Sequence, residues 1–302
     1  MTFYRSNQQM EAKLEELINQ FAKEGRPGLH NSLSISWIRY DKMSPEPHSG
    51  EGAGWSDEKL IYPASVVKLI YGIATEAWIQ KGLLPESQEI RDAVGDMIIH
   101  SSNDATSLVI DLLTGTTSGP ILPNARWERW KRQRELINKW LSGFQWEELK
   151  DVNCCQKTWT DGPYGREKQF YGSGRANQNL LTTRATARML EAVMTNAIIS
   201  PISCRKLRNL LSRSLDIGGR RNDPENQIDG FLGEGLVQGS RLWSKAGWMS
   251  TVRHDAAWIS SPESNPILLI VFSQGRQLAN DTFLLPALAN ELCKASKEID
   301  SQ

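Results

Sequence analysis

Ser65 and Lys68 are two polar residues inside the apolar run IYPASVVKLIYGIATEAW, which spans residues 61–78. Positions three apart share one face of a helix, so a helix here places the serine hydroxyl beside the lysine ammonium. Pro63 favours a helix that begins just before Ser65, where free backbone N–H groups and the helix dipole stabilise negative charge. Desolvation lowers the pKa of a lysine, and the neutral amine can take the proton of a serine. The spacing predicts an activated nucleophile, although a capping serine near a solvent-reaching lysine has the same spacing.

Two later stretches add polar side chains to predicted elements. In MIIHSSNDATSLVIDLL, Ser101 and Asn103 come at the head of a helical pattern. In LWSKAGWMSTVRHDAAWI, Lys245 comes two residues before Gly247 on a predicted strand, where a glycine lets a substrate approach the backbone closely. With these stretches the chain resembles the penicillin-recognising serine hydrolases, and most closely the class A β-lactamases, whose motifs are Ser-x-x-Lys, Ser-Asp-Asn and Lys-Thr-Gly in this order. The resemblance covers nearly the whole chain.

The resemblance implies a role for each matching residue. Ser65 is the expected nucleophile that becomes acylated, and Lys68 is the neighbour that activates it. Ser101 is expected to pass a proton to the leaving nitrogen, and Asn103 to bind both the substrate's acyl side chain and the active-site lysine. The oxyanion hole of this family uses two backbone N–H groups, here those of Ser65 and Trp248, and two such donors stabilise the tetrahedral oxygen strongly.

The same resemblance implies a region that receives a substrate carboxylate. Lys245 is expected to add positive charge there, and Arg253 falls close to the place of a carboxylate-binding arginine in many class A enzymes. A plain solvent-facing arginine is the alternative for Arg253. The triplet is Lys-Ala-Gly, so the hydroxyl that contacts the carboxylate in the family is missing at Ala246. The short separation between Ser65 and Ser101 implies an abbreviated helical lobe on one side of the cleft.

The residue that would release the acyl group is less well defined. Class A enzymes carry Glu-x-x-Leu-Asn upstream of a Thr-Thr helix start, and here Thr182 and Thr183 supply that start. Glu167 precedes them by a fitting separation, but Phe170 and Tyr171 stand where the family has leucine and asparagine. The asparagine that helps to hold the hydrolytic water is therefore absent. Glu167 is either the general base of deacylation or a solvated loop acid.

The order of predicted elements is helix, strands, a long helical block, strands, helix. The first helix has apolar residues at helical spacing, namely Met10, Leu14, Leu17, Ile18 and Phe21. The predicted strands are LSISWIRY (33–40), one within 41–54, VRHDAAWIS (252–260) and PILLIVFS (266–273), the last two joined as a hairpin by SPESN. The block 65–213 is mainly helical, and NDTFLLPALANELCKASKEI forms the last helix.

This order predicts an α+β fold, a three-layer α/β/α arrangement with an antiparallel sheet plus an inserted all-helical subdomain. We expect residues 1–60 together with 215–302 to form the sheet with its flanking terminal helices, and residues 61–214 to form the helical subdomain. The active site then lies in the cleft between them.

Composition narrows the class of partner. The 302 residues are 39% hydrophobic and 23% charged with a formal net charge of zero, so no whole-chain field favours nucleic acid or a membrane surface. No run is long enough to span a bilayer.

The segment 126–148 mixes tryptophans with basic residues. This composition suits either binding of single-stranded nucleic acid or an amphipathic helix packed on the lobe, and we favour the helix. We expect a small-molecule substrate and no nucleic acid; the oligomeric state stays open.

The N-terminal residues have no apolar core of the signal-peptide type, so the sequence as it stands predicts a cytoplasmic chain, or a periplasmic or secreted one if a leader was removed. The four cysteines include the adjacent pair Cys154 and Cys155 and are expected to be reduced and packed as small hydrophobes. No Cys-x-x-Cys pair occurs, and the four histidines lie far apart, which argues against structural zinc. No metal or organic cofactor is implied, because a lysine and backbone amides supply what the chemistry needs.

These features predict a serine hydrolase that forms an acyl-enzyme, with a β-lactam amide as the first choice of substrate. The alternatives are a hydrolase of the same fold acting on peptidoglycan peptides, esters or another amide, and a penicillin-binding sensor domain that is acylated but does not turn over. A Ser-His-Asp hydrolase is set aside, because His254 and Asp255 are sequence neighbours and no Gly-x-Ser-x-Gly turn occurs.

Overall fold

A seven-stranded sheet is the central layer of the computed structural model, which describes residues 3–223, 226–262 and 264–300. The strand order is β1-β3-β2-β7-β6-β5-β4, so strands from both ends of the chain join in one sheet. All neighbouring strands are antiparallel except the two-residue edge strand β1, which runs parallel to β3. The strands are β1 (Arg5–Ser6), β2 (Leu33–Arg39), β3 (Glu51–Trp55), β4 (Ser212–Arg213), β5 (Arg241–Met249), β6 (Val252–Ser260) and β7 (Ile267–Gln274).

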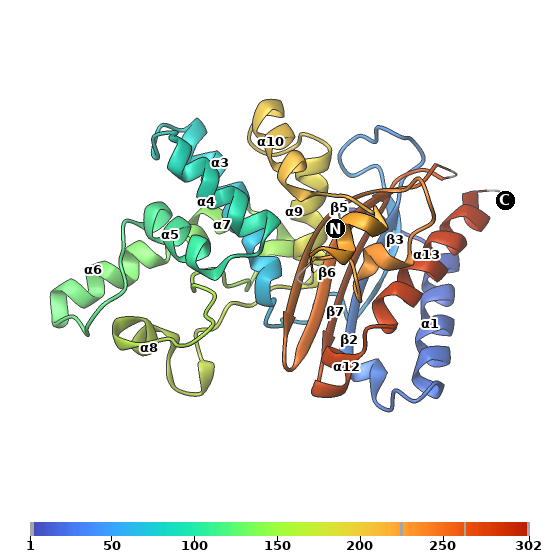
Figure 1. Cartoon of the computed structure of the whole chain (residues 1–302), viewed down its shortest axis with the longest axis horizontal. Coiled ribbons are helices and arrows are strands. Elements are labelled where there is room, and N and C mark those ends of the chain that lie inside the picture. The colour runs from blue at the N-terminus through green and yellow to red at the C-terminus, as the bar shows by residue number, and fades with distance from the viewer. Residues whose placement is uncertain (1–2, 224–225, 263, 301–302) are drawn as a thin grey trace.

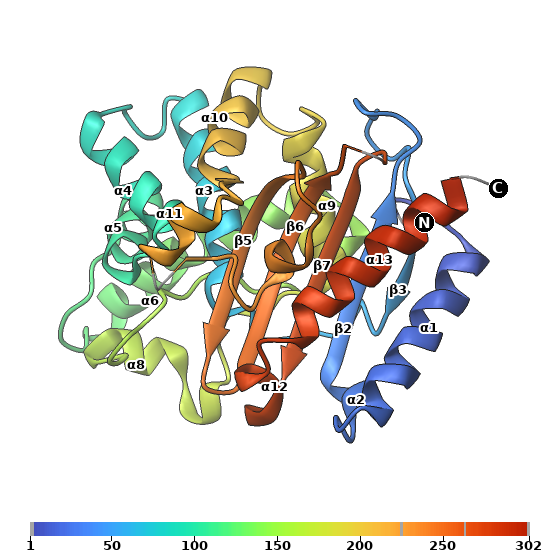
Figure 2. The ribbon, with the colours of Figure 1, turned by 45° about the vertical axis from the view of Figure 1, so that its right-hand side comes forward.

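Helices cover both faces of this sheet and form a lobe beside it (Figure 1). The terminal helices α1 and α13 lie together on one face, as Figure 2 shows, while α9 packs on the other. The helices are α1 (Gln8–Lys23), α2 (Leu29–Ser32), α3 (Val67–Gln80), α4 (Gln88–Ile99), α5 (Asn103–Thr114), α6 (Asn124–Arg134), α7 (Leu136–Ser142), α8 (Gly165–Tyr171), α9 (Thr183–Met194), α10 (Pro201–Leu211), α11 (Ile217–Arg221), α12 (Arg276–Asn280) and α13 (Leu284–Asp300). Short 3-10 turns are η1 (Ala64–Val66), η2 (Glu147–Leu149), η3 (Ser173–Arg175) and η4 (Leu232–Gly235).

The side-chain alternation along β7 explains why the sheet needs cover on both faces. Leu269 and Val271 belong to the apolar cluster under α1 and α13, whereas Leu268 and Ile270 belong to the cluster shared with the helical lobe. Each set buries its apolar surface only if a layer of helices covers that face. The central strands are therefore apolar on both sides, and the result is the three-layer α/β/α arrangement predicted from the sequence.

The structure confirms the predicted fold class and most of the predicted elements. The strand predicted within 41–54 is β3, and the predicted hairpin is β6 and β7, although residue 263 of its connection lies outside the described residues. The helix predicted to contain Ser65 in its first turn begins instead with the 3-10 turn η1, and α3 starts at Val67. The short edge strand β4 falls inside the block predicted as mainly helical.

The tryptophan-rich segment forms α6 and α7, and its aromatic rings pack within the lobe. Trp127 and Trp130 stack with ring centroids 5.5 Å apart, and Phe170 meets the Trp130 ring edge-on at 5.3 Å. Trp130 is buried, and its indole N–H donates to the Thr117 carbonyl at 3.0 Å. The segment thus forms two consecutive helices whose indole rings contribute to the packing of the lobe.

Two remaining predictions concern cysteines and membrane spans. All four cysteines are free thiols, and Cys154, Cys155 and Cys204 are buried, as expected for cysteines that pack as small hydrophobes. Within the described ranges, none of the helices combines the length and the apolar character needed to cross a bilayer.

Candidate active site

Ser65 lies in the turn η1, where β5 passes unusually close to the backbone. A Cβ atom at Gly247 would lie 2.9 Å from the Pro63 carbonyl oxygen and 3.0 Å from the backbone nitrogens of Ser65 and Val66. Real Cβ atoms hardly ever come so near to other atoms, so only glycine fits at position 247 while the turn stays in place. The preceding Ala64 has a φ of 46°, a left-handed conformation that is uncommon outside glycine. This contact puts the backbone N–H of Ser65 next to the strand that carries Trp248, the other expected oxyanion donor.

Lys68 is fully buried one turn further along the chain. Its Nζ donates to Asn103 Oδ1 at 2.8 Å, to Ser101 Oγ at 3.2 Å and to the Ser101 carbonyl oxygen. Burial lowers the pKa of Lys68 to about 7, because the charged form loses its solvation. No carboxylate among the described residues forms an ion pair with this ammonium, so a substantial fraction of the amine is neutral at neutral pH.

Ser101 lies in the connection between α4 and α5, with a left-handed φ of 56°. The side chain of the next residue, Ser102, accepts from Ala105 N at 3.1 Å and caps α5, which fixes the connection in place. Ser101 Oγ accepts one hydrogen bond from Lys68 and a second, of 3.1 Å, from Lys245 Nζ. With both acceptor positions occupied, the hydroxyl hydrogen is left to point elsewhere.

Lys245 reaches the site from β5 and is also fully buried. Besides Ser101, its Nζ contacts the Ala246 carbonyl oxygen at 2.8 Å and the side-chain oxygen of Gln227. The pKa of Lys245 lies well below its ordinary value, chiefly through burial and then through the positive charges of Lys68 and Arg213. Sequence patterns provided no reason to single out Gln227, which belongs to no motif.

These residues open into a cavity of about 390 Å³ that is lined by Ser65, Ser101, Ala246, Gly247, Trp248 and Arg253, among others. The structure therefore brings together the predicted nucleophile, the predicted proton shuttle and the Lys-Ala-Gly strand. Asn103 joins the same group through its hydrogen bond to Lys68, and its Nδ2 donates to Thr160 Oγ1 at 3.1 Å.

Arg253 is buried beside this cavity and is not the solvent-facing arginine that the sequence left as an alternative. Its guanidinium donates to the carbonyl oxygens of Ala279 at 3.0 Å and Gly230 at 3.2 Å. The same group lies 4.8 Å from the ring centroid of Phe231 and 5.8 Å from that of Trp248. The aromatic rings and carbonyl groups hold this positive charge at one end of the cavity.

Glu167 is buried and does not face solvent. It lies on α8, fully buried, and its oxygens accept from Arg134 at 2.7 and 3.1 Å and from Ser118 Oγ at 2.9 Å. Lys157 Nζ lies 3.7 Å away, so the carboxylate belongs to a buried cluster of charges. Glu167 does not line the cavity with Ser65 and makes no contact with Lys68. It is not a solvated loop acid, because α6 supplies the Arg134 guanidinium that covers it.

His254 and Asp255 face different surroundings, as the sequence order suggested. Both ring nitrogens of His254 are occupied, because Nδ1 accepts from Ser273 N at 3.1 Å and Nε2 meets the Tyr62 carbonyl oxygen at 3.0 Å. Burial lowers the pKa of His254 to about 4 and raises that of Asp255 to about 7. Asp255 lies opposite Ala246 in the sheet and accepts from Leu232 N at 3.1 Å. A histidine that is neutral and satisfied by backbone groups has no free nitrogen to activate a serine.

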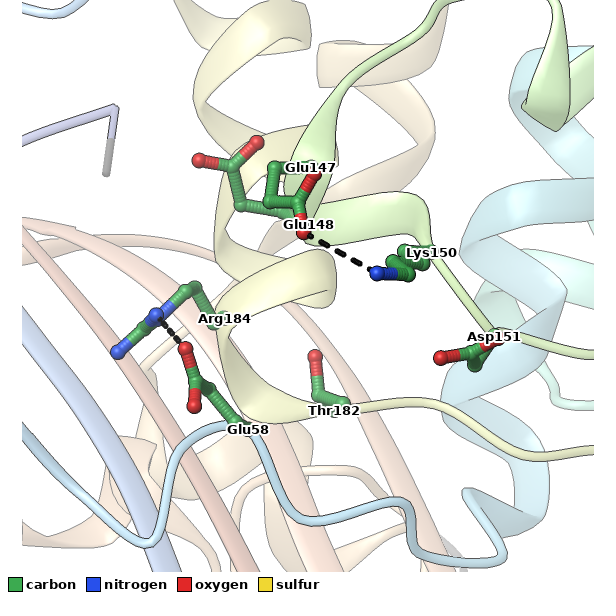
Figure 3. A pocket seen from close by; sticks show the side chains of 7 residues that line it. All are labelled: Glu58, Glu147, Glu148, Lys150, Asp151, Thr182 and Arg184. Carbon is green, nitrogen blue, oxygen red and sulfur yellow. Dashed lines mark hydrogen bonds and ion pairs between the residues drawn. The ribbon is translucent and has the colours of Figure 1, made fainter. Parts of the chain in front are cut away.

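A second cavity of about 440 Å³, which Ser65 does not line, lies near the start of α9 (Figure 3). Its walls are mostly acidic, but the basic groups there already pair with acids: Arg184 with Glu58, and Lys150 with Glu147 at 3.7 Å. It contains no group placed to act as a nucleophile beside a base, so the Ser65 cavity is the better candidate for chemistry.

The chain is similar to known proteins in sequence family and in fold. A family model described as "Beta-lactamase enzyme family" matches residues 79–295, a range that begins after the Ser65 and Lys68 pair. A search of curated proteins by sequence finds no match. Among solved structures, a mutant of PBP-A in an acyl-enzyme complex with penicillin G has a TM-score of 0.66 at 14% identity, over 97% of this chain and 98% of that chain.

Two bacterial structures described as β-lactamases are similarly close in fold. The one from Chitinophaga pinensis has a TM-score of 0.65 at 14% identity, covering 94% of this chain and 98% of that chain. The one from Xanthomonas campestris has a TM-score of 0.62 at 17% identity, covering 95% of this chain and 98% of that chain. At these identities the likeness establishes the fold alone.

Proposed function

Because the chain belongs to the beta-lactamase enzyme family, we propose that it is a serine hydrolase in which Ser65 attacks the amide carbonyl of a β-lactam and becomes acylated. The observation that carries this proposal is the position of Ser101 Oγ between the ammonium groups of Lys68 and Lys245, in the cavity that Ser65 lines. That arrangement supplies a base, a proton path and positive charge without further groups.

Acylation follows from the chemistry of these side chains. The neutral amine of Lys68 takes the proton of the Ser65 hydroxyl, and the oxygen forms a bond to the carbonyl carbon. The negative charge on the tetrahedral oxygen is stabilised by the backbone N–H groups of Ser65 and Trp248. When the carbon–nitrogen bond breaks, Ser101 donates a proton to the leaving nitrogen and recovers one from Lys68.

The remaining residues orient the substrate in this proposal. Lys245 and Arg253 provide positive charge for the carboxylate of the substrate, and Asn103 donates to the carbonyl of its acyl side chain. Ala246 offers no hydroxyl, so the carboxylate depends on these two cations more than in a site with Lys-Thr-Gly.

Release of the acyl group is the slow step in our proposal. Hydrolysis of the ester at Ser65 needs a base that activates water. Glu167, the acid that the sequence offered as a candidate base, has its carboxylate bound by Arg134 and Ser118 and does not line the cavity. We therefore expect a persistent acyl-enzyme and slow turnover, which favours a penicillin-binding protein over an efficient β-lactamase.

Intact-mass measurement after mixing with benzylpenicillin tests both the acylation of Ser65 and the slow release of the acyl group. The expected result is an adduct of one penicillin mass that forms on Ser65 and decays over minutes to hours, with no adduct on Ser65→Ala. Ser142→Ala, a change of an exposed serine on α7, serves as the matched control and should behave as the wild type. If no β-lactam acylates the wild type, the β-lactam proposal is wrong, and an unchanged hydrolytic activity in Ser65→Ala would remove the nucleophile assignment. Rapid loss of drug with no lasting adduct would identify an efficient hydrolase instead.

A further inference from the structure

Gln227 connects three parts of the site, and we propose that it is a positioning residue that holds the Lys245 ammonium against Ser101. Gln227 lies outside every motif of the chain. The proposal rests on the proposed function only for the measurement of acylation rates. Gln227 lines the Ser65 cavity, and its side chain is almost fully buried. It follows shortly after residues 224–225, which lie outside the described ranges, in the connection between α11 and β5.

The amide of Gln227 bridges the strand and the helix that carry the site. Its Nε2 donates to the carbonyl oxygens of Ile98 at 3.2 Å and Ile99 at 2.8 Å, at the end of α4. Its Oε1 accepts from Ala246 N at 3.1 Å and from Lys245 Nζ. All the hydrogen-bonding positions of the amide are thus in use, and exchanging its oxygen and nitrogen would break every contact. The end of α4 leads directly to Ser101, so one side chain fixes the separation of Lys245 and the shuttle.

The neutral charge of this amide matters as much as its position. Lys245 faces the cations Lys68 and Arg213 and the buried acid Asp255. A neutral acceptor orients the Lys245 ammonium but does not stabilise its charge as strongly as a carboxylate would. Gln227 can therefore fix the direction of the Nζ–H bonds of Lys245 without raising the pKa of that lysine as a carboxylate would.

Arg213 supports the same end of α4 from the sheet. Its guanidinium donates to the Ile98 carbonyl oxygen at 3.0 Å and to the Ser244 carbonyl oxygen at 2.9 Å. Ile98 therefore receives donors from both Arg213 and Gln227, while Ile99 receives one from Gln227. Loss of Gln227 would leave α4 attached to β5 through Arg213, but Lys245 would keep only the Ser101 hydroxyl and the Ala246 carbonyl of the three acceptors described above. This separation of roles makes the proposal testable.

Two substitutions distinguish positioning from simple packing. Gln227→Leu keeps most of the volume and removes every hydrogen bond, whereas Gln227→Glu keeps an acceptor for Lys245, adds a negative charge and removes both donors to α4. Gln133→Leu makes the same chemical change at a glutamine of α6, whose Nε2 donates to the Gly115 carbonyl oxygen at 3.4 Å outside the site. Two quantities are measured as a function of pH for each protein: the ¹³Cε shift of Lys245 by NMR, and the rate of acylation by benzylpenicillin.

If Gln227 positions Lys245, Gln227→Leu slows acylation by about tenfold or more, since a proton-transfer group has lost its alignment. Gln227→Glu raises the pKa of Lys245, because an opposite charge now lies beside the ammonium, and the midpoint of the ¹³Cε titration moves to higher pH. Gln133→Leu changes neither quantity. A packing role alone predicts that Gln227→Leu, which keeps most of the volume, is acylated at the wild-type rate.

The proposal is overturned if Gln227→Leu, folded by its NMR spectrum, acylates within about twofold of the wild type. It is equally overturned if neither substitution moves the Lys245 titration. Should Gln227→Leu fail to fold, the Gln227→Glu titration decides alone. The Lys245 titration needs no reaction with a β-lactam. If the wild type is never acylated, the proposed function is wrong, but the titration still tests whether Gln227 positions Lys245.

Discussion

Lys68 and Lys245 donate to one oxygen atom, Ser101 Oγ, at 3.2 and 3.1 Å. Both lysines are fully buried, and each reaches Ser101 from a different side of the molecule, one from α3 and one from β5. Two ammonium groups that share a neighbour in a desolvated site repel each other, so holding both charged is unfavourable. The arrangement therefore favours loss of one proton near neutral pH, which is the condition that a serine nucleophile needs.

The rate of acylation should follow the titration of Lys68. Its pKa is lowered to about 7 by burial, and only the neutral amine accepts the Ser65 proton. We expect the rate to rise about tenfold per pH unit below pH 7 and to level off above it, since the neutral fraction changes in that way. The rate of adduct formation with benzylpenicillin, followed by intact mass between pH 5 and 9, measures this pH dependence. A rate that is flat across pH 6 to 8 would contradict Lys68 as the base.

The same shift predicts how stability depends on pH. The pKa of Lys68 is about 7 in the folded chain and 10.5 for a free lysine, so between these values the unfolded chain binds more protons. The free energy of unfolding should then rise with pH across this window, with Lys68 contributing on the order of 1 kcal/mol per pH unit. Urea unfolding at pH 7.5 and 9.5, for the wild type and for Lys68→Met, measures that contribution. Equal pH slopes in the two proteins would mean that Lys68 keeps an ordinary pKa when folded.

The motif residues could be anticipated from the sequence because their roles depend on short spacings. Ser65 and Lys68 are fixed by one helical turn, and Ser101 and Lys245 stand out because polar groups begin or interrupt otherwise apolar elements. The order of the predicted helices and strands predicted the layers, because strands from both ends of the chain join most simply in one sheet that helices cover.

Gln227 and Glu167 could not be placed in this way. Gln227 gains its role only because an irregular connection returns to the end of α4, and such a path leaves no periodic signal. The position of Glu167 depends on Arg134, which α6 brings to it from 33 positions away in sequence. The spacing from Thr182 gives the position of Glu167 along the chain, but it does not indicate the direction in which the Glu167 side chain points.

Substitution of Gly247 should separate the turn η1 from β5. A Cβ at this position would lie within 3.0 Å of three backbone atoms, so Gly247→Ala requires the Ser65 turn to move. We expect acylation to fall by about a hundredfold and the free energy of unfolding to fall by about 1–3 kcal/mol, as in other overpacked sites. Gly95→Ala on α4 is the matched control, because nothing lies within 4 Å of the place that its new Cβ would take, and this change should be neutral or slightly stabilising. Wild-type acylation in Gly247→Ala would mean that the close contact does not organise the site.

Glu167→Gln distinguishes a structural ion pair from a deacylating base. Glu167 and Arg134 are both fully buried, and removing the Glu167 charge leaves Arg134 with Asp111, 3.3 Å away, as its remaining acidic partner, so we expect a cost of about 3 kcal/mol. Glu147→Gln provides the control, because its pair with Lys150 at 3.7 Å is exposed and should contribute at most about 1 kcal/mol. We expect Glu167→Gln to lower the urea midpoint strongly while the penicillin adduct on the folded fraction decays at the wild-type rate. A longer-lived adduct with unchanged stability would instead make Glu167 the base, since loss of the carboxylate would then act on the hydrolytic water and not on the buried pair.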